Sequence, residues 1–304
     1  MQIHPTLLKF RLIPNPNQNW LKAHRYQESD IAFVIYTSSK FYHTRAMALR
    51  DTWLSRVTNY YFLSSKPYSN LPVTVIKNAG EDYVSNMKKI FYGLQLIYGQ
   101  QISKPLNERQ KWYYLIGCDT YVNVRHLLKR LESYDYQQIY YIGGHTGHEK
   151  CYDTPGGSII FPSGGGGFLL SFKLLEKLQV NLTDYLENKW PNTNPMSDVA
   201  LACLIKRIGH NLTQVEGFWS HTPAQMVQFD GFAAVQKVIE PNNWHYVMPA
   251  DMINLDEFYS FQYVDRLAND QNLEEMVEFI RLFIKKHYEI LRKKHKECTL
   301  PPVT

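Results

Sequence analysis

The chain has 304 residues, of which 44% are hydrophobic and 20% are charged, and its formal net charge is +5. This composition is typical of a globular protein and excludes extensive disorder. Because much of the positive charge lies in one C-terminal segment, residues 285–296, and not in a groove, we expect no nucleic-acid partner.

The first half of the chain alternates between two kinds of pattern. Residues 1–30 are polar and rich in Pro and Asn, which predicts an N-terminal arm. We expect strands over residues 31–37, 60–63, 73–76, 112–116 and 139–142. We expect helices over residues 46–54, around 87–97 and around 127–131. This alternation predicts an α/β fold with a mainly parallel, twisted sheet and helices on both faces.

The second half is more irregular. A glycine run, Gly164–Gly167, precedes a helix that begins near Phe172. An amphipathic helix begins at Asp198, with Ser197 as its expected N-cap and Gly209 as its expected stop. A last apolar stripe with basic residues around it predicts a C-terminal helix. We therefore divide the chain into an arm (1–30), a main domain (31–265) and a basic amphipathic helix with a tail (266–304).

Cysteines and apolar runs bear on the compartment. The chain has four cysteines, Cys118, Cys151, Cys203 and Cys298. They show neither a paired framework nor a CxxC spacing, which predicts no disulfide-stapled module and favours a reducing compartment. No segment has a signal-peptide pattern or the roughly 18 apolar residues of a membrane span. We expect a cytoplasmic or peripheral membrane protein, or a Golgi-lumenal one if an N-terminal anchor was removed; only a secretory lumen would make the glycosylation triplets at Asn181 and Asn211 relevant.

Four sequence blocks carry the chemical signal. They are TSSKFYHTRAMALRDTWLSR (37–56), WYYLIGCDTYVNVRHLL (112–128), SGGGGFLLS (163–171) and the segment from Asp198 to the FWSH of 218–221. In this order the blocks resemble those of the fringe and β-1,3-galactosyltransferase group. That group has an R-x5-D-T-W helix, a D-D-D-x-Y-V-N-V strand end, a T-G-G-A-G-F loop and an F-H-S-H segment.

The resemblance implies a GT-A-type nucleotide-sugar-binding fold and an inverting, metal-assisted transfer. The donor would be a UDP-sugar carrying a hexose or an N-acetylhexosamine, and the new bond a β-1,3 linkage. The acceptor would be a hydroxyl of a glycan, a glycoprotein or a lipid-linked glycan. For a lipid-linked acceptor, the basic C-terminal helix suggests peripheral contact with an anionic membrane, although a solvated basic face is the more common explanation of such a pattern.

The resemblance also implies a metal site. Asp119 matches the last residue of the family's acidic triplet and His221 matches the second His of F-H-S-H, so both are expected to ligate Mn²⁺ or another divalent cation. Carboxylate and imidazole groups suit such an ion, which neutralises charge that grows on a leaving pyrophosphate. Gly117 and Cys118 replace the other two acidic residues. This departure motivates an alternative, a catalytically silent fringe-like module that binds a glycan or a protein.

The remaining site residues also follow from the resemblance. A carboxylate at a helix start suits a general base that takes the acceptor's proton, and Asp198 matches this position. Thr37, Arg45, Cys118 and Asp119 are the expected donor-binding residues. The expected acceptor- or sugar-binding residues are Gly165, Gly166, Gly167 and Trp219, since glycines let a backbone approach a sugar closely.

Two further readings stay open. The family's lysine in the second helix corresponds to Lys88 or Lys89, because the register is ambiguous. The His145-x-x-His148-x-x-Cys151 spacing resembles a zinc site. Together with Asp119 and His221 it suggests a metal hydrolase, a second alternative that predicts bound zinc and no affinity for UDP.

Overall fold

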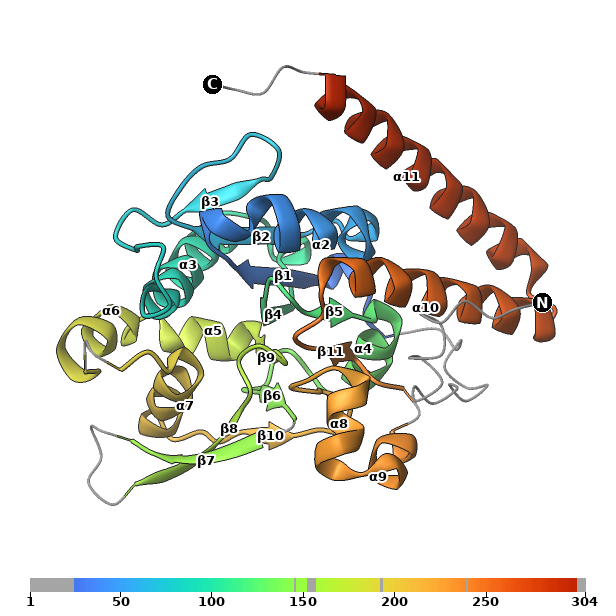
Figure 1. Ribbon diagram of the computed structural model, residues 1–304. Coiled ribbons are helices and arrows are strands. Elements are labelled where there is room, and N and C mark those ends of the chain that lie inside the picture. The colour runs from blue at the N-terminus through green and yellow to red at the C-terminus, as the bar shows by residue number, and fades with distance from the viewer. Residues whose placement is uncertain (1–24, 145, 152–156, 192–193, 239, 300–304) are drawn as a thin grey trace.

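A computed structural model of the chain describes residues 25–144, 146–151, 157–191, 194–238 and 240–299. Its centre is a seven-stranded sheet in the order β10-β6-β9-β4-β1-β2-β3, with helices on both faces (Figure 1). The strands are β1 (Ile31–Tyr36), β2 (Tyr60–Ser64), β3 (Val73–Val75), β4 (Trp112–Gly117), β6 (Tyr141–Gly143), β9 (Phe168–Ser171) and β10 (Thr213–Gln214).

The sheet is mainly parallel, as predicted. β1 pairs in parallel with β2 and β4, β2 with β3, and β6 with β10. The exception is β9, which runs antiparallel between β4 and β6. This reversal places the start of β9 beside the end of β4, so the loop before β9 reaches the same sheet edge as the loop after β4.

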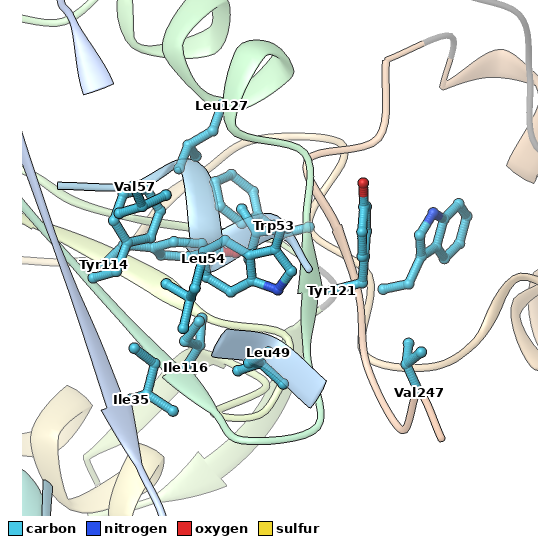
Figure 2. Close-up of a cluster of buried hydrophobic side chains, with 14 of the residues drawn as sticks. Ile35, Leu49, Trp53, Leu54, Val57, Tyr114, Ile116, Tyr121, Leu127 and Val247 are labelled. Carbon is cyan, nitrogen blue, oxygen red and sulfur yellow. The ribbon is translucent and has the colours of Figure 1, made fainter. Parts of the chain in front are cut away.

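Two apolar cores, one on each face, hold the helices against the sheet. Ile31, Phe33 and Ile35 of β1 belong to one core, while Ala32 and Val34 belong to the other. This alternation is the period of two that a strand imposes on its side chains. The first core includes residues of α2 (Met47–Asp51), α4 (Val124–Leu131) and α10 (Pro249–Asn269), and Figure 2 shows part of it. The second includes residues of α3 (Ser85–Ile102), α5 (Phe172–Leu178) and α7 (Ser197–Arg207).

Smaller elements complete the described chain. Two short strands, β5 (Tyr121–Val122) and β11 (Asn243–Trp244), form an antiparallel pair, and β7 (Thr146–Lys150) pairs with β8 (Ser158–Pro162). The other helices are α6 (Leu182–Asp184), α8 (Pro223–Asp230), α9 (Phe232–Lys237) and α11 (Leu273–Thr299). No helix in the described ranges is long and apolar enough to cross a membrane.

The predicted helix over 46–54 is interrupted. A π-helical turn (Tyr42–Ala46), α2 and a 3-10 turn (Trp53–Arg56) replace it. The break falls at Thr52, whose hydroxyl donates to the carbonyl oxygen of Ala48 at 2.6 Å and whose backbone leaves the helical region. A turn here lets the side chain of Trp53 enter the core, where it is 2% exposed.

Helix α7 ends as predicted but begins one residue early. Ser197 is its first residue and Met196 its N-cap, so the prediction of Ser197 as the N-cap is wrong. The helix ends at Arg207, and Gly209 has a φ of +87°, a conformation that favours glycine and stops a helix.

The start of the described chain and the first turns of α11 pack on the rest of the protein. Tyr26, in the predicted arm, is buried and its ring meets Trp112 edge-on. At the other end, α10 runs across the expected boundary at 265/266 and packs against α11 through Tyr263, Leu267 and Phe279. The expected arm residues 1–24 lie outside the described chain, as do the side chains of the basic segment beyond 290, so the three-part division stays a prediction.

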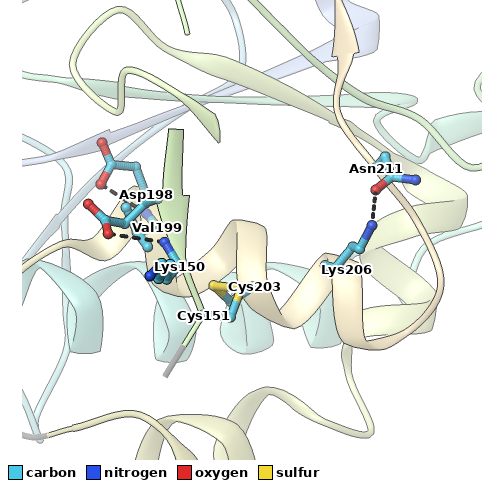
Figure 3. The surroundings of a disulfide bond; sticks show 8 residues. Lys150, Cys151, Asp198, Val199, Cys203, Lys206 and Asn211 are labelled. Atoms are coloured by element: carbon cyan, nitrogen blue, oxygen red, sulfur yellow. Dashed lines mark hydrogen bonds between the residues drawn. A yellow bond between two sulfur atoms is a disulfide. The ribbon is translucent and has the colours of Figure 1, made fainter. Parts of the chain in front are cut away.

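A disulfide joins Cys151, at the end of β7, to Cys203 in α7, with 5.6 Å between the two Cα atoms. The expectation of unpaired cysteines is therefore wrong. The two residues are 52 positions apart and come together only because β8 brings β7 against α7. Figure 3 shows Cys203 on the same helix that carries Asp198 at its start.

This disulfide is expected to stabilise the fold. Replacing both Cys151 and Cys203 with Ala should lower the free energy of unfolding by about 3 kcal/mol, chiefly because the unfolded chain regains freedom. Urea unfolding followed by circular dichroism measures the change. Dithiothreitol should lower the urea concentration at which half of the wild-type protein is unfolded, toward the value of the double variant, and should leave the double variant unchanged. An equal effect of the reductant on both proteins would contradict the prediction.

Candidate active site

The candidate site lies at the sheet edge where β1 and β4 end. Tyr36 of β1 pairs with Gly117 of β4, so the residues that follow them emerge at the same edge. The Gly164–Gly167 loop reaches this edge because it precedes the reversed strand β9. Together these segments line a cavity of about 300 Å³. Six predicted site residues line it: Thr37, Arg45, Cys118, Asp119, Gly165 and Asp198.

Asp119 is the centre of a buried charge cluster. Its side chain is 11% exposed, its Oδ2 accepts from Nη1 of Arg45 at 2.8 Å, and its Oδ1 lies 3.2 Å from Nε2 of His245. Burial alone raises the pKa of the Asp119 carboxyl, but His245 and then Arg45 outweigh burial and lower this pKa below its usual value. The carboxylate therefore stays charged at the cavity wall.

Arg45 is held in place from two sides. Besides its ion pair with Asp119, its guanidinium lies 4.3 Å from the centre of the Phe41 ring. Stacking of this kind favours the planar arginine side chain. A fixed guanidinium beside the cavity suits an anionic ligand such as a phosphate group.

His245 is a site residue that the sequence did not identify. It directly follows β11, whose Trp244 pairs with Tyr121 of β5, so His245 arrives beside Asp119. Its Nδ1 lies 2.9 Å from the carbonyl oxygen of Ser220. Short strands such as β5 and β11 leave no readable alternation in a sequence, and no motif surrounds His245.

Asp198 lies in the first turn of α7 and is half-buried. The backbone N–H of Gly164 donates to its Oδ2 at 2.9 Å, and the N–H of Val199 donates to its Oδ1 at 3.0 Å. Burial raises the pKa of the Asp198 carboxyl, and the two hydrogen bonds offset this only in part. A carboxylate with a raised pKa holds a proton more strongly, as a general base requires.

The glycine run packs tightly, and only its first half reaches the cavity. Gly164 and Gly165 line it, whereas Gly166 and Gly167 are not among its lining residues. A Cβ on Gly166 would come within 3.0 Å of the Trp219 carbonyl oxygen. Gly167 has a φ of +85° and lies against Tyr114. The two glycines thus shape the loop, and their predicted contact with a sugar has no support from this geometry.

Trp219 and His221 also lie outside the lining of the cavity. The Trp219 ring is buried and stacks on Trp244, with 5.9 Å between ring centres. The His221 ring packs against Phe229 and Tyr246, and its Nδ1 lies 2.7 Å from the hydroxyl of Ser220. Their roles in sugar and metal binding stay predictions.

Two buried groups bear on the resemblance, the thiol of Cys118 in the cavity lining and the side chain of Lys89 in α3. Burial raises the pKa of the Cys118 thiol to about 11, so this residue is a neutral thiol at pH 7 and does not replace a lost carboxylate. Lys89 is fully buried while Lys88 is half-exposed, which favours Lys89 as the counterpart of the family's lysine. In the described chain, Lys89 Nζ and Ser38 Oγ are buried without a hydrogen-bond partner. Ser38 lines the cavity, where a bound ligand can satisfy its hydroxyl.

A divalent cation fits this site only with help from a ligand. Asp119 and His245 offer one carboxylate and one imidazole, but no group of three or more His, Cys, Asp or Glu among the described residues could hold an ion. Mn²⁺ accepts such mixed donors, and octahedral cations often take one or two protein ligands with substrate phosphates and water. The residues therefore fit a cation whose other ligands come from a diphosphate.

The alternative zinc cluster loses one of its three ligands. Cys151 is bonded to Cys203, so its sulfur is not a thiolate, and His145 lies outside the described residues. The metal-hydrolase alternative built on this cluster is therefore not supported.

A larger cavity of about 480 Å³ lies between α4, α10 and α11. Its two arginines are already engaged, because Arg56 pairs with Asp256 and Arg125 lies 3.5 Å from the centre of the Tyr263 ring. The lining of the cavity at the sheet edge combines several carboxylates, including Asp119 and Asp198, with cationic side chains and a glycine loop, so this cavity is the better candidate.

Comparison with known proteins identifies the family. The Fringe-like family model matches residues 26–262. Lunatic fringe, a β-1,3-N-acetylglucosaminyltransferase, is 26% identical over 160 residues in Gallus gallus, which covers 49% of this chain and 43% of that protein. The Danio rerio lunatic fringe is 25% identical over 206 residues, covering 63% of this chain and 54% of that protein. The chain thus spans about half the length of the curated relatives it matches.

Solved structures are similar at a more distant level. A glycosyltransferase involved in glycosylating the major capsid of PBCV-1 has a TM-score of 0.42 and 15% identity, over 74% of this chain and 99% of that one. The glycosyltransferase GlyE of Streptococcus pneumoniae TIGR4, in its apo form, has a TM-score of 0.42 and 12% identity, over 71% of this chain and 54% of that one. Similarities of this size do not by themselves establish a function.

Proposed function

Because the chain belongs to the Fringe-like family, we propose that it is a glycosyltransferase that moves a hexose or an N-acetylhexosamine from a UDP-sugar to an acceptor hydroxyl. The mainly parallel sheet with helices on both faces confirms the predicted α/β fold class, and membership of the Fringe-like family supports the GT-A type that we propose. The acceptor class we propose is a glycan, a glycoprotein or a lipid-linked glycan, and the linkage β-1,3, as the names of the fringe relatives suggest.

One observation carries this proposal. A single cavity holds a charged Asp119–Arg45 pair and, separately, a carboxylate with a raised pKa, Asp198. Carboxylates in environments that move their pKa values in opposite directions are suited to different tasks. The Asp119 side suits a diphosphate, and the Asp198 side suits a hydroxyl that must lose its proton.

In the proposed reaction, the proton of the acceptor goes to the Asp198 side of the cavity, and the negative charge on the leaving UDP develops on the Asp119 side. As the acceptor oxygen attacks the anomeric carbon, its proton passes to the Asp198 carboxylate. The bond between that carbon and the UDP oxygen breaks from the opposite face, and its electron pair leaves with UDP, which inverts the configuration. The Arg45 guanidinium lies where it can stabilise the growing negative charge on UDP.

A divalent cation, Mn²⁺ in our proposal, would add positive charge beside the same leaving group when bound. Asp119 is the carboxylate that would hold it, with an imidazole as its second protein ligand. Gly164 keeps Asp198 oriented through its backbone N–H.

A direct assay tests the function. Purified protein should release UDP from at least one of UDP-galactose, UDP-N-acetylglucosamine and UDP-N-acetylgalactosamine when a β-linked glycan acceptor is present. Mn²⁺ should increase the rate and EDTA should abolish the increase. An assay in which a phosphatase converts the released UDP to inorganic phosphate measures the rate of UDP release, with heat-denatured protein as the control.

The second candidate is a silent fringe-like module that binds a glycan or a protein. The observation that favours it is the replacement of two acidic positions by Gly117 and the neutral thiol of Cys118. No UDP release with any donor, together with no UDP binding by calorimetry, would favour this candidate over the transferase.

The disulfide changes our proposal for the compartment. Disulfides persist mainly in oxidising environments, so the Cys151–Cys203 bond supports a secretory lumen such as the Golgi over a reducing cytoplasm. Peripheral membrane contact through α11 remains a proposal that rests on the sequence of its basic end.

A further inference from the structure

We propose that Asn211 carries an N-linked glycan, as the first residue of an Asn-Leu-Thr triplet that ends at Thr213. N-linked glycans are attached to Asn-x-Ser/Thr triplets on the surface of proteins that enter a secretory lumen. The inference rests on the compartment that the Cys151–Cys203 bond supports, and it does not depend on the transferase activity. The other triplet of the chain, at Asn181, has a different environment.

Asn211 lies on the surface, between the end of α7 and the start of β10. It is exposed and belongs to neither element. Gly209, with its φ of +87°, turns the chain away from α7 two residues earlier. Thr213 is the first residue of β10, the strand at one edge of the main sheet, and it pairs with Ile142. A bulky group on Asn211 therefore projects from a loop without displacing a helix or a strand.

The amide of Asn211 is oriented so that its nitrogen is available. Its Oδ1 accepts from Nζ of Lys206 at 3.0 Å. A lysine ammonium only donates, so this contact fixes which amide atom faces Lys206. Figure 3 shows the amide nitrogen of Asn211 pointing away from Lys206. Because a glycan is attached to the nitrogen, the modified side chain keeps its oxygen and can keep the contact with Lys206.

There is also room for a sugar beside this amide. Asn211 and Leu212 line a cavity of about 490 Å³ together with Ile160 of β8. A cavity of this size accepts small molecules. Ile160 is 41% exposed, and an adjacent sugar ring can cover part of its apolar surface, which is favourable in water. The first sugar of a glycan on Asn211 therefore fits next to the chain.

The triplet at Asn181 is less suited to modification. Asn181 is half-buried and directly precedes α6. Leu182 is buried in the core that includes α3, and the hydroxyl of Thr183 accepts from Nε2 of Gln95 in α3 at 2.6 Å. A glycan on Asn181 would lie where α6 packs against α3. We therefore expect Asn181 to stay unmodified.

The modification is a group transfer from a lipid-linked oligosaccharide, catalysed by the oligosaccharyltransferase of the secretory pathway. The side-chain nitrogen of Asn211 forms a bond to C1 of the first sugar, and the bond between C1 and the lipid diphosphate breaks. The electron pair of that bond leaves with the diphosphate, and the amide nitrogen loses one hydrogen as a proton.

Helix α7 keeps the glycan away from the candidate active site. Asp198 lies in the first turn of this helix, and Asn211 follows its last turn. A helix rises about 1.5 Å per residue, so the two ends of α7 are about 15 Å apart. Asn211→Gln should therefore change the affinity for UDP by less than about twofold.

Mass spectrometry of the full chain tests the inference. The chain is directed into the secretory pathway of cultured animal cells by an added signal peptide, and it is also purified from its own organism. Peptide N-glycosidase F converts a glycosylated Asn to Asp, and in water enriched in heavy oxygen the new Asp is labelled. In both preparations the label should appear in tryptic peptide 208–237, which contains Asn211, and not in peptide 178–189, which contains Asn181. Samples without the enzyme control for spontaneous deamidation.

Four variants of the secreted chain show which residues the modification needs. The wild-type protein should migrate faster in a denaturing gel after treatment with the glycosidase. Asn211→Gln and Thr213→Ala should lose this shift, whereas Thr213→Ser, which keeps a hydroxyl, and Asn181→Gln should retain it. Because Thr213→Ala and Thr213→Ser leave Asn211 in place, this pair decides the question if Asn211→Gln fails to fold.

Two outcomes would overturn the inference. One is an unlabelled peptide 208–237 in either preparation of the wild-type protein. The other is a gel shift that is lost in Asn181→Gln and retained in Asn211→Gln. Neither outcome bears on the transferase proposal, which fails instead if the wild-type protein binds no UDP.

Discussion

Replacing Asp198 with Asn is expected to lower kcat by about 100-fold to 10,000-fold, the range in which general bases contribute. The amide cannot take the acceptor's proton, and it keeps nearly the same size and shape. Steady-state UDP release under saturating donor and acceptor measures the change. UDP affinity should stay within about twofold, because the proposed diphosphate contacts are at Asp119 and Arg45.

The effect of Asp198→Asn on stability can be separated from its effect on turnover. The carboxylate accepts from two backbone N–H groups, of Gly164 and Val199, while an amide has only one oxygen. Some loss of stability is therefore expected, about 1 kcal/mol for one unsatisfied donor. Asp265→Asn, at an exposed position on α10, is the control for the charge change. Near-normal turnover by Asp198→Asn would show that the base lies elsewhere.

The decrease of kcat at low pH should follow the protonation of Asp198. Its pKa is raised by burial, whereas that of Asp119 is lowered by His245 and Arg45. As the pH falls, the base therefore becomes protonated and inactive before the diphosphate site loses its charge. The kcat of the wild-type enzyme should fall at a higher pH than an ordinary aspartate would give, and this decrease should disappear in Asp198→Asn.

Replacing Asp119 with Asn is the second change with a large expected effect. It should lower kcat/KM by at least about 30-fold, since removing one partner of a buried charged pair typically costs about 2–5 kcal/mol. Arg45 and His245 would both lose a charged neighbour. Calorimetric titration of the protein with UDP, in the presence of Mn²⁺, should show that UDP binds correspondingly more weakly to Asp119→Asn than to the wild-type protein.

The loss in Asp119→Asn should appear mainly in UDP affinity, in contrast to Asp198→Asn. Asp265→Asn again controls for the removal of one negative charge. If Asp119→Asn bound UDP and Mn²⁺ as tightly as the wild-type protein, this carboxylate would have no part in the donor site.

Five of the seven strands of the sheet, β1, β2, β3, β4 and β6, were predictable because each has a local β-rich run, whereas β9 and β10 were not predicted. The helix α3 was predictable because its apolar residues from Met87 to Ile97 lie three and four apart, and all of them are buried in the structure. The interruption at Thr52 was not predictable, because it depends on the burial of the Trp53 side chain in the core, which involves residues far away in the sequence. Tertiary packing, and not propensity, decides that break.

The site was predictable to the extent that its residues sit in motifs. Thr37, Asp119 and Asp198 follow or begin regular elements and line the cavity as expected. His245 depends on the pairing of two-residue strands that are far apart in the chain. The Cys151–Cys203 bond depends in the same way on long-range packing, which spacing alone does not reveal.

The pairing of β11 with β5 has a consequence for the order of synthesis. The backbone N–H of Val247 donates to the backbone carbonyl oxygen of Asp119 at 3.0 Å. Residues 243–247, which are synthesised long after Asp119, therefore complete the pocket around the Asp119 side chain. A ribosome that has released every strand of the main sheet has therefore not yet produced a competent pocket. Nascent chains that end before residue 243 would fold their sheet and still lack one wall of the proposed nucleotide-sugar site.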